Sequence, residues 1–298
     1  MRKKILFTGG SGLLALNWAY QIRNIYDIVL GLHEKVINVS GVTSVMISLE
    51  NEVEFLNSIQ NIKPDLIIHT AGMTNVDLCE ADPNMASKIN FEAVKYVSNV
   101  CSKNNIDLIF ISTDHLFNGK KSFVEENQLK APINWYGRTK SLGEDYIAVN
   151  NPNSLIIRTN FFGWGTSYRQ SFSDFIINSL SSGKNITLFH DIYYTPILID
   201  VLVINVMNLY LSKAAGIFNV VSNERISKFE FGLMVADIFG LDPSLILKGK
   251  IEDKLELVQR PKDLSLSNQK LIDFLKTSIP SIKDQILELK KQEKRFNF

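Results

Sequence analysis

The sequence has few of the residues that mark disulfide-bonded, metal-binding or membrane-spanning proteins. It has two cysteines, Cys79 and Cys101, and no Cys-x-x-Cys spacing, so we expect reduced, mostly buried thiols in a cytoplasmic protein. Its four histidines are scattered along the chain, which predicts no metal site. No apolar run approaches the length of a membrane-spanning helix, so we expect no membrane partner.

The sequence also lacks an excess of charge of either sign. Its 298 residues include 32 Lys plus Arg and 31 Asp plus Glu, which gives a net charge of +1. This balance leaves no general electrostatic footprint for nucleic acid, and we expect no such partner. The basic start, Arg2 to Lys4, precedes an apolar run that a glycine-rich segment cuts short, so the sequence predicts no secretory signal. What is present, 45% hydrophobic and 21% charged residues, is typical of a globular protein.

Short apolar runs alternate with helical patterns over the first 165 residues. The expected strands cover residues 4–8, 27–32, 45–49, 64–69, 107–112 and 154–158, and the expected helices between them include 16–22, 50–61 and 82–104. Such alternation predicts an α/β fold of the Rossmann type, a doubly wound parallel sheet with helices on both faces.

The rest of the chain is less regular. It contains helical patterns at 171–181, 199–211, 227–239 and 281–294, and short strand-like runs at 185–189 and 217–220. No repeat, low-complexity tract or flexible linker separates the two parts. We therefore expect residues 1–165 to form a nucleotide-binding domain and residues 166–298 a smaller α/β substrate-binding lobe, with some of its elements returning to the first domain.

A glycine-rich turn joins the first expected strand to the first expected helix. The turn contains Gly9, Gly10 and Gly12, and Ala15 stands where a third glycine often lies. Strand, glycine turn and helix is the arrangement of a dinucleotide-binding unit, because glycine lets the backbone approach a diphosphate at the helix N-terminus. We therefore expect NADP(H) or NAD(H) as cofactor.

The end of the second expected strand bears on the choice between those two cofactors. An acidic residue there would bind the ribose 2′-hydroxyl of NAD, but the segment is Gly31-Leu32-His33-Glu34-Lys35, without an acid at the strand end. His33 or Lys35 could face a 2′-phosphate, or all three polar residues could be solvated loop residues. We predict that NADPH serves at least as well as NADH.

Small and hydroxyl-bearing residues follow two later strands. The expected strand at 64–69 ends at Thr70-Ala71-Gly72-Met73-Thr74, and the strand at 107–112 ends at Ser112-Thr113-Asp114. Ligands of open α/β sheets bind at the carboxyl ends of the strands. Both segments therefore predict a ligand crevice, although Ser, Thr and Asp also favour plain turns.

Tyr136 and Lys140 lie four residues apart in a stretch that reads as the start of a helix. Side chains at this spacing share one helix face, which places a phenol beside an ammonium group. A nearby cation would lower the pKa of the tyrosine toward the working range of a proton donor. The alternative is an exposed lysine packed along a tyrosine ring.

Taken in order, these motifs resemble those of the extended short-chain dehydrogenase/reductases, and most closely the dTDP-4-dehydrorhamnose reductase family. The matching segments span nearly the whole chain and are Thr8-Gly9-Gly10-Ser11-Gly12, Ala71-Gly72-Met73-Thr74-Asn75-Val76-Asp77, Glu80, Ser112-Thr113-Asp114-His115-Leu116-Phe117-Asn118-Gly119, Tyr136-Gly137-Arg138-Thr139-Lys140, Gly143-Glu144, Ile157-Arg158-Thr159 and Arg260-Pro261.

The resemblance implies a role for each matching position. Tyr136 would donate a proton to the substrate carbonyl, Lys140 would lower its pKa and hold the nicotinamide ribose, and Thr113 would hydrogen-bond the same carbonyl. Tyr136 and Lys140 would also bind the cofactor. The other expected cofactor-binding residues are Gly9, Ser11, Gly12, Leu13, Leu14, Ala71, Gly72, Thr74 and, from the strand-end argument, His33. The sugar nucleotide would be bound by Ser112, Thr113, Asp114, Phe161 and Arg260.

Three positions depart from the family pattern. Ala15 replaces the last glycine of the turn, Leu49 stands where an aspartate often lies near the adenine, and Phe161 stands where a tryptophan is common. The last two changes affect the expected contacts to the adenine and the sugar.

The resemblance implies an NAD(P)H-dependent reductase of a nucleotide-linked 4-keto sugar, in deoxysugar or cell-surface polysaccharide biosynthesis. One alternative is a sugar-nucleotide epimerase or dehydratase of the same superfamily, but no Asp-Glu pair follows Thr113, which favours the reductase. The other is a non-catalytic regulatory subunit with the same fold. A homodimer is the default expectation, because two-fold assemblies dominate soluble oligomers.

Overall fold

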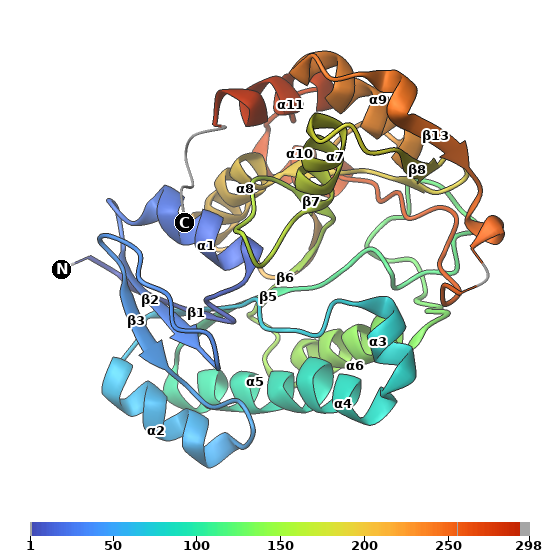
Figure 1. Cartoon of the computed structure of the whole chain (residues 1–298). Coiled ribbons are helices and arrows are strands. Elements are labelled where there is room, and N and C mark those ends of the chain that lie inside the picture. The colour runs from blue at the N-terminus through green and yellow to red at the C-terminus, as the bar shows by residue number, and fades with distance from the viewer. Residues whose placement is uncertain (1, 255, 293–298) are drawn as a thin grey trace.

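Seven parallel strands form the main sheet in the computed structural model, which describes residues 2–254 and 256–292 (Figure 1). The strand order is β11-β6-β5-β4-β1-β2-β3. The strands are β1 (Lys4–Thr8), β2 (Asp27–Leu32), β3 (Thr43–Met46), β4 (Leu66–His69), β5 (Asp107–Ile111), β6 (Leu155–Arg158) and β11 (Gly216–Asn219). The central strands are apolar on both faces because helices cover both sides of the sheet. This confirms the doubly wound Rossmann-type fold.

The strand order reverses between β1 and β4, the topological switch point of the sheet. From β1 the order runs outward to β2 and β3 on one side, and then from β4 to β5, β6 and β11 on the other. Crevices open at the carboxyl ends of the strands at such a switch point, and ligands of open α/β sheets bind there. The segments that follow β1, β4 and β5 therefore face one another across a common edge.

Helices cover the sheet on both faces (Figure 1). One face buries its apolar residues against α2 (Glu52–Ile62), α5 (Ala93–Asn104) and α6 (Trp135–Asn150). The other face packs against α1 (Leu13–Ile22), α8 (Ile199–Leu211) and α10 (Gln269–Leu275).

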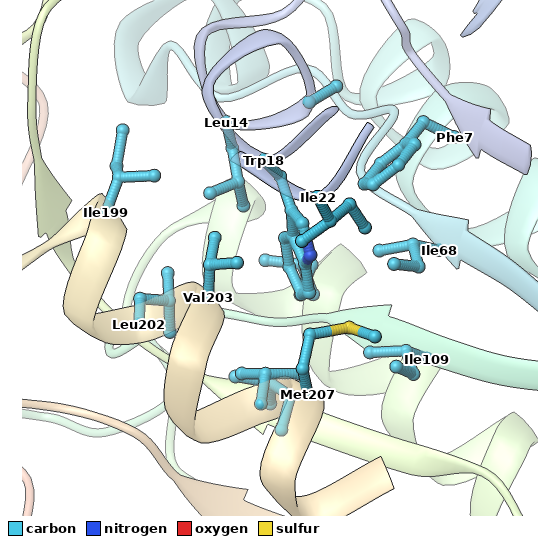
Figure 2. Close-up of a cluster of buried hydrophobic side chains, with 14 of the residues drawn as sticks. Phe7, Leu14, Trp18, Ile22, Ile68, Ile109, Ile199, Leu202, Val203 and Met207 are labelled. Atoms are coloured by element: carbon cyan, nitrogen blue, oxygen red, sulfur yellow. The ribbon is translucent and has the colours of Figure 1, made fainter. Parts of the chain in front are cut away.

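The second half of the chain contributes to the core of the sheet. Figure 2 shows Leu202, Val203 and Met207 of α8 beside Trp18 of α1, over the sheet residues that include Ile109. Strand β11 pairs with β6 in parallel, from Gly216 opposite Leu155 to Asn219 opposite Arg158. Segment 199–219 therefore packs as part of the main sheet layer, whereas the domain boundary at residue 165 stays a prediction.

A second apolar core lies under the remaining elements of the chain. It packs α7 (Phe172–Ser181), α9 (Lys228–Phe239) and α11 (Ile282–Lys291) around short strand pairs. The pairs are β7 (Phe161–Phe162) with β10 (Ile197–Leu198), β8 (Ile186–Phe189) with β13 (Ile246–Gly249), and β9 (Tyr193–Tyr194) with β12 (Ile226–Ser227). Two 3₁₀ turns, η2 (Pro243–Leu245) and η3 (Ile251–Asp253), complete this part.

The structure differs from the expected elements at several places. The helix expected over 82–104 is α4 (Pro83–Ser87), a π-helical turn η1 (Lys88–Glu92) and α5, because the register changes within it. A short helix that the sequence did not predict, α3 (Val76–Ala81), precedes it. The third strand lies at 43–46 rather than 45–49, and the first helix begins at residue 13 rather than 16. Residues 293 and 294 of the last expected helix lie outside the described residues.

Candidate active site

A cavity of about 490 Å³ opens at the carboxyl ends of the central strands. Most of the predicted site residues line it, from five separate segments of the chain. They are Gly12, Leu13, Leu14, Ala71, Gly72, Thr74, Ser112, Thr113, Asp114, Tyr136, Lys140 and Phe161. Gly9, Ser11, His33 and Arg260 do not line this cavity.

The glycine turn after β1 has the backbone geometry that only glycine adopts easily. Gly9 has a φ of +67°, and a Cβ atom there would lie 2.7 Å from the Cα atom of Ala71. The Gly12 N–H donates to the Gly9 carbonyl at 2.8 Å and closes the turn. The positive φ and this close approach to the next strand's end both require a residue without a side chain.

The N-terminus of α1 points its first turn at the cavity. Gly12 is the N-cap and has no side chain to accept a hydrogen bond, and Leu13, Leu14 and Ala15 line the cavity wall. The first N–H groups of a helix have no partner within the helix and carry the positive end of its dipole. This arrangement fits a diphosphate group such as that of a dinucleotide.

The polar residues after β2 lie at the protein surface. His33 and Glu34 are exposed, and the His33 Nδ1 atom lies 3.8 Å from the Glu34 carboxylate. The Lys35 ammonium lies 3.1 Å from the centroid of the Tyr168 ring, and the Tyr168 hydroxyl donates to the Ser11 carbonyl at 3.1 Å. The segment around Tyr168 therefore contacts the glycine turn from the second half of the chain, which the sequence did not reveal.

Tyr136 lies in the first turn of α6, as predicted, and its ring is buried. The Asn134 side chain caps this helix by accepting from the Gly137 N–H at 2.9 Å. Burial raises the pKa of the Tyr136 phenol, and a hydrogen bond with the Thr113 side chain opposes part of that rise. The expected lowering of this pKa by Lys140 is wrong for the structure, because desolvation outweighs the other influences on the phenol.

Lys140 is also buried, with 5% of its side chain exposed, so the alternative of an exposed lysine along the Tyr136 ring is wrong. Its ammonium donates to the Ile111 carbonyl at 2.7 Å, at the end of β5. Burial lowers its pKa to about 7, and the buried carboxylate of Glu144 opposes this change. Lys140 is therefore held at the carboxyl end of a central strand, where its charge is sensitive to what binds in the cavity.

Asp114 is buried, lines the same cavity as Tyr136 and Lys140, and accepts two hydrogen bonds. One carboxylate oxygen accepts from the Thr113 hydroxyl at 3.2 Å and the other accepts from the Asn160 amide at 2.6 Å. Asn160 comes from the segment after β6 and also lines the cavity. The sequence interpretation missed Asn160, although it follows directly after a strand, as the predicted site residues do.

Asn90 is a second residue that the sequence interpretation missed. It lies in the π-helical turn η1, and its amide donates to the Met73 carbonyl at 3.0 Å and to the Thr139 hydroxyl at 3.2 Å, while its oxygen accepts from the Met73 N–H at 2.8 Å. Asn90 thus joins the loop after β4 to the helix that carries Tyr136. π-helical turns are frequent at functional sites and have no simple sequence signal.

Three polar atoms around the cavity have no hydrogen-bond partner. They are the Ser112 hydroxyl, the Thr159 hydroxyl and the His115 Nδ1 atom, and all three residues line the cavity. Buried polar atoms in proteins nearly always have a partner. We infer that a ligand supplies some of these partners. Within residues 2–254 and 256–292, the side chains form no group of three or more acids, histidines or cysteines suited to a metal ion.

A second cavity, of about 380 Å³, adjoins the first, and His115 and Asn160 line both. Its walls include the aromatic rings of Phe172, Phe175 and Phe189. Arg260 lines this second cavity, but its guanidinium forms an ion pair with Asp77 at 2.6 Å. The two cavities together offer a polar site at the strand ends and a more apolar extension toward α7 and β8.

Comparisons with known proteins agree with this geometry. A family model described as the RmlD substrate binding domain matches residues 3–294. The probable low-salt glycan biosynthesis reductase Agl14 of Haloferax volcanii is 31% identical over 229 residues, which cover 76% of each chain. The beta subunit of methionine adenosyltransferase 2 of Xenopus laevis is 27% identical over 232 residues, 76% of this chain and 69% of that protein. No helix within the described residues is long and apolar enough to cross a membrane.

Two solved structures are similar to this chain over almost its whole length. The structure of a hypothetical dTDP-4-dehydrorhamnose reductase from Sulfolobus tokodaii has 30% identity and a TM-score of 0.83, and covers 96% of this chain and 99% of its own. The Bacillus anthracis dTDP-4-dehydrorhamnose reductase in complex with NADP has a TM-score of 0.88 at 22% identity, over 98% and 100% of the two chains, which shows the shared fold. The chain therefore belongs to the RmlD family of extended short-chain dehydrogenase/reductases, as its motifs indicate.

Proposed function

We propose that the protein is an NAD(P)H-dependent reductase of a nucleotide-linked 4-keto sugar, of the kind used to make deoxysugars and cell-surface polysaccharides. The observation that carries the proposal is the placement of Thr113, Tyr136 and Lys140 in one cavity that the glycine turn also borders. The names of Agl14 and of the S. tokodaii protein support a reductase in glycan or deoxysugar biosynthesis.

The first cavity suits a dinucleotide. The glycine turn and the N-terminus of α1 would hold its diphosphate, and Lys140, Ala71, Gly72 and Thr74 would border the rest. When bound, the reduced nicotinamide would supply the hydride. The roles of Gly9, Ser11 and His33, which do not line the cavity, stay predictions.

The protein's own groups would then control the proton and the carbonyl. Tyr136 and Thr113, whose side chains share a hydrogen bond, would both donate to the carbonyl oxygen and stabilise the negative charge that develops there. The binding of the nicotinamide ribose by Lys140, which lines the same cavity, stays a prediction. The fixed position of Asp114 suits it to orienting a sugar hydroxyl.

The second cavity suits the nucleotide end of the substrate. Its three phenylalanine rings offer faces on which a base can stack. Phe161, which lines the first cavity, and Arg260, which lines the second, stay predicted contacts of the sugar nucleotide. We also propose, from the sequence, that the enzyme works in the cytoplasm and forms a homodimer.

The decisive experiment is a panel of 4-keto sugar nucleotides, with dTDP and UDP as carriers, incubated with NADPH or NADH. We expect loss of absorbance at about 340 nm, the usual signal of cofactor oxidation, in proportion to the sugar alcohol formed. Tightly bound NAD⁺ together with interconversion of two sugar nucleotides, and no net change in absorbance, would assign the protein to the epimerases instead.

A second candidate function has one specific observation in its favour. The similarity to the beta subunit of methionine adenosyltransferase 2 favours the regulatory alternative, in which the fold is kept for binding a partner enzyme. The buried Thr113, Tyr136 and Lys140 argue against loss of catalysis. Stoichiometric capture of a partner enzyme, combined with no turnover of any sugar nucleotide, would favour the regulatory subunit.

A further inference from the structure

Lys228 is a cation in the second cavity that the sequence motifs do not assign to any role. It is the first residue of α9, and its half-buried side chain lines the cavity wall. Its ammonium lies 3.4 Å from the centroid of the Tyr194 ring and 4.6 Å from that of Phe172. Two aromatic rings therefore hold the ammonium in a defined place beside the cavity.

No carboxylate of the described residues lies within 4 Å of the Lys228 ammonium, which takes part in none of the ion pairs found there. Burial lowers its pKa to about 8, and the more distant charge of Asp114 opposes that change only in part. The N-terminus of a helix also disfavours a cation, because the positive end of the helix dipole lies there. Lys228 is thus placed where folding alone would favour an uncharged or acidic residue, and such exceptions are typical of functional sites.

Arg260, the other cation of this cavity, has its charge largely neutralised. One terminal nitrogen donates to the Asp77 carboxylate at 2.6 Å and the other donates to the Val258 carbonyl at 3.2 Å. Because Asp77 compensates the guanidinium, Arg260 attracts a bound anion less than its formal charge suggests. The uncompensated positive charge on the cavity wall belongs to Lys228.

We propose that the ammonium of Lys228, rather than the guanidinium of Arg260, is the principal cation that binds the diphosphate of the sugar-nucleotide substrate. The proposal rests on the proposed function for the class of substrate. Lys228 stands on the cavity that His115 and Asn160 connect to the catalytic cavity, so a diphosphate beside it would link a sugar at Tyr136 to a base among the phenylalanine rings. A phosphate oxygen would supply the hydrogen-bond acceptor and the counter-charge that the ammonium lacks.

Titration calorimetry of the full chain with dTDP, UDP and the uncharged nucleoside thymidine tests this inference without any turnover. The variant Lys228→Met keeps most of the side-chain volume but loses the charge. We expect it to bind both nucleoside diphosphates about 10- to 100-fold more weakly, as is usual for a lost charge-assisted hydrogen bond. Binding of thymidine and of NADPH should stay within about twofold of wild type, and Lys228→Arg should recover part of the affinity.

Lys248→Met is the matched control, because the Lys248 ammonium also lies over an aromatic ring, 5.7 Å from the centroid of Phe229, but on an exposed side chain outside the cavity. It should leave every affinity unchanged. Unchanged diphosphate affinity in Lys228→Met, or a larger loss in Arg260→Gln than in Lys228→Met, would overturn the inference. Lack of any nucleoside diphosphate binding by the wild-type protein would instead overturn the proposed substrate class, and this inference with it.

Discussion

At the scale of single residues, burial shifts the pKa values of Tyr136 and Lys140, both on α6, in opposite directions. It raises the pKa of Tyr136 and lowers that of Lys140 to about 7. Both effects favour the neutral form, because a low-dielectric environment penalises charge. Near neutral pH Tyr136 is therefore protonated, as a proton donor must be, and Lys140 lies close to its titration midpoint.

Replacing Tyr136 by phenylalanine tests the proton donor. We expect kcat to fall by about 10²- to 10⁴-fold, the usual contribution of a positioned general acid, with the Kd for NADPH nearly unchanged. Stopped-flow reduction and fluorescence titration of the cofactor give the two quantities. Tyr146→Phe, on the same helix but bonded to Asn99, is the control, and near wild-type turnover by Tyr136→Phe would contradict the mechanism.

The titration of Lys140 predicts a pH dependence of stability. The pKa of Lys140 is about 7 in the folded protein and about 10.4 in the unfolded chain. Between these two pH values the unfolded chain binds more protons, so the free energy of unfolding rises with pH. The cost of burying the charged ammonium is fully present below pH 7 and is relieved as the pH rises.

We therefore compare urea unfolding of the wild type with that of the variant Lys140→Met. All other titrating groups are the same in both proteins, so the difference isolates Lys140. The free energy of unfolding of the wild type minus that of the variant should increase from pH 7 to pH 9, by at most about 1.4 kcal/mol per pH unit. A difference that stays flat or falls over this range would show that Lys140 keeps its charge when buried.

The residues after β2 predict the cofactor preference. His33 and Glu34 are exposed and lie 3.8 Å apart, and no acid of the strand itself reaches its carboxyl end. We expect kcat/KM with NADPH to equal or exceed that with NADH, because nothing at the strand end repels a 2′-phosphate as a fixed acid would. Steady-state kinetics with both cofactors measure this, and a hundredfold preference for NADH would refute it.

At the scale of elements, the π-helical turn η1 connects the loop after β4 to α6, the helix that carries Tyr136 and Lys140. It directs Asn90 between the loop after β4 and α6, where the side chain bonds the Met73 backbone and the Thr139 hydroxyl. The same side chain limits the space at Gly72, because a Cβ atom added there would lie 3.1 Å from the Asn90 side-chain oxygen. The turn therefore sets the distance between two walls of the cavity.

Asn90→Ala removes these hydrogen bonds and leaves the Met73 backbone without its partners. We expect a loss of about 1–3 kcal/mol in the free energy of unfolding, the usual cost of unsatisfied buried groups, and a fall in kcat/KM of about 10-fold or more, as expected when a positioned site shifts. Urea unfolding and steady-state kinetics measure the two effects. Asn84→Ala, exposed on the preceding helix, should change neither, and a fully active Asn90→Ala would exclude this positioning role.

At the scale of the whole molecule, the main sheet is completed by residues far beyond its expected boundary. Strand β11 covers one edge at β6, and α8 covers the apolar face around Phe7, Trp18 and Ile109 (Figure 2). The order of the elements along the chain and their order in space therefore differ. The predicted site residues of the first half therefore lie on a sheet whose packing the second half completes.

A chain truncated after residue 165 tests how far the predicted nucleotide-binding domain is independent. We expect it not to unfold cooperatively, because it would expose the face that α8 covers and leave the edge of β6 unpaired. Circular dichroism with urea titration, beside the full chain, gives the answer. A sharp cooperative transition in the truncated chain would support residues 1–165 as an autonomous domain.

The sequence by itself determined the strand, turn and helix order of the nucleotide-binding part and the residues that meet at the strand ends. Apolar periodicity and glycine conformation are local properties, so they can be read along the chain. Several of the predicted residues that line the main cavity were expected together because carboxyl ends of parallel strands share one edge. Tyr136 and Lys140 were paired by their helical spacing, whereas Leu13, Leu14 and Phe161 came from the family resemblance alone.

Only the tertiary structure decided the charge state of those residues and the partners they have. Groups distant in sequence set the pKa of Tyr136, pair Arg260 with Asp77 and place the Lys228 ammonium over the Tyr194 ring. The same holds for Asn90 and Asn160, whose contacts come from separate elements. Electrostatic energies depend on burial and on distances in space. Neither quantity follows from the spacing of residues along the chain.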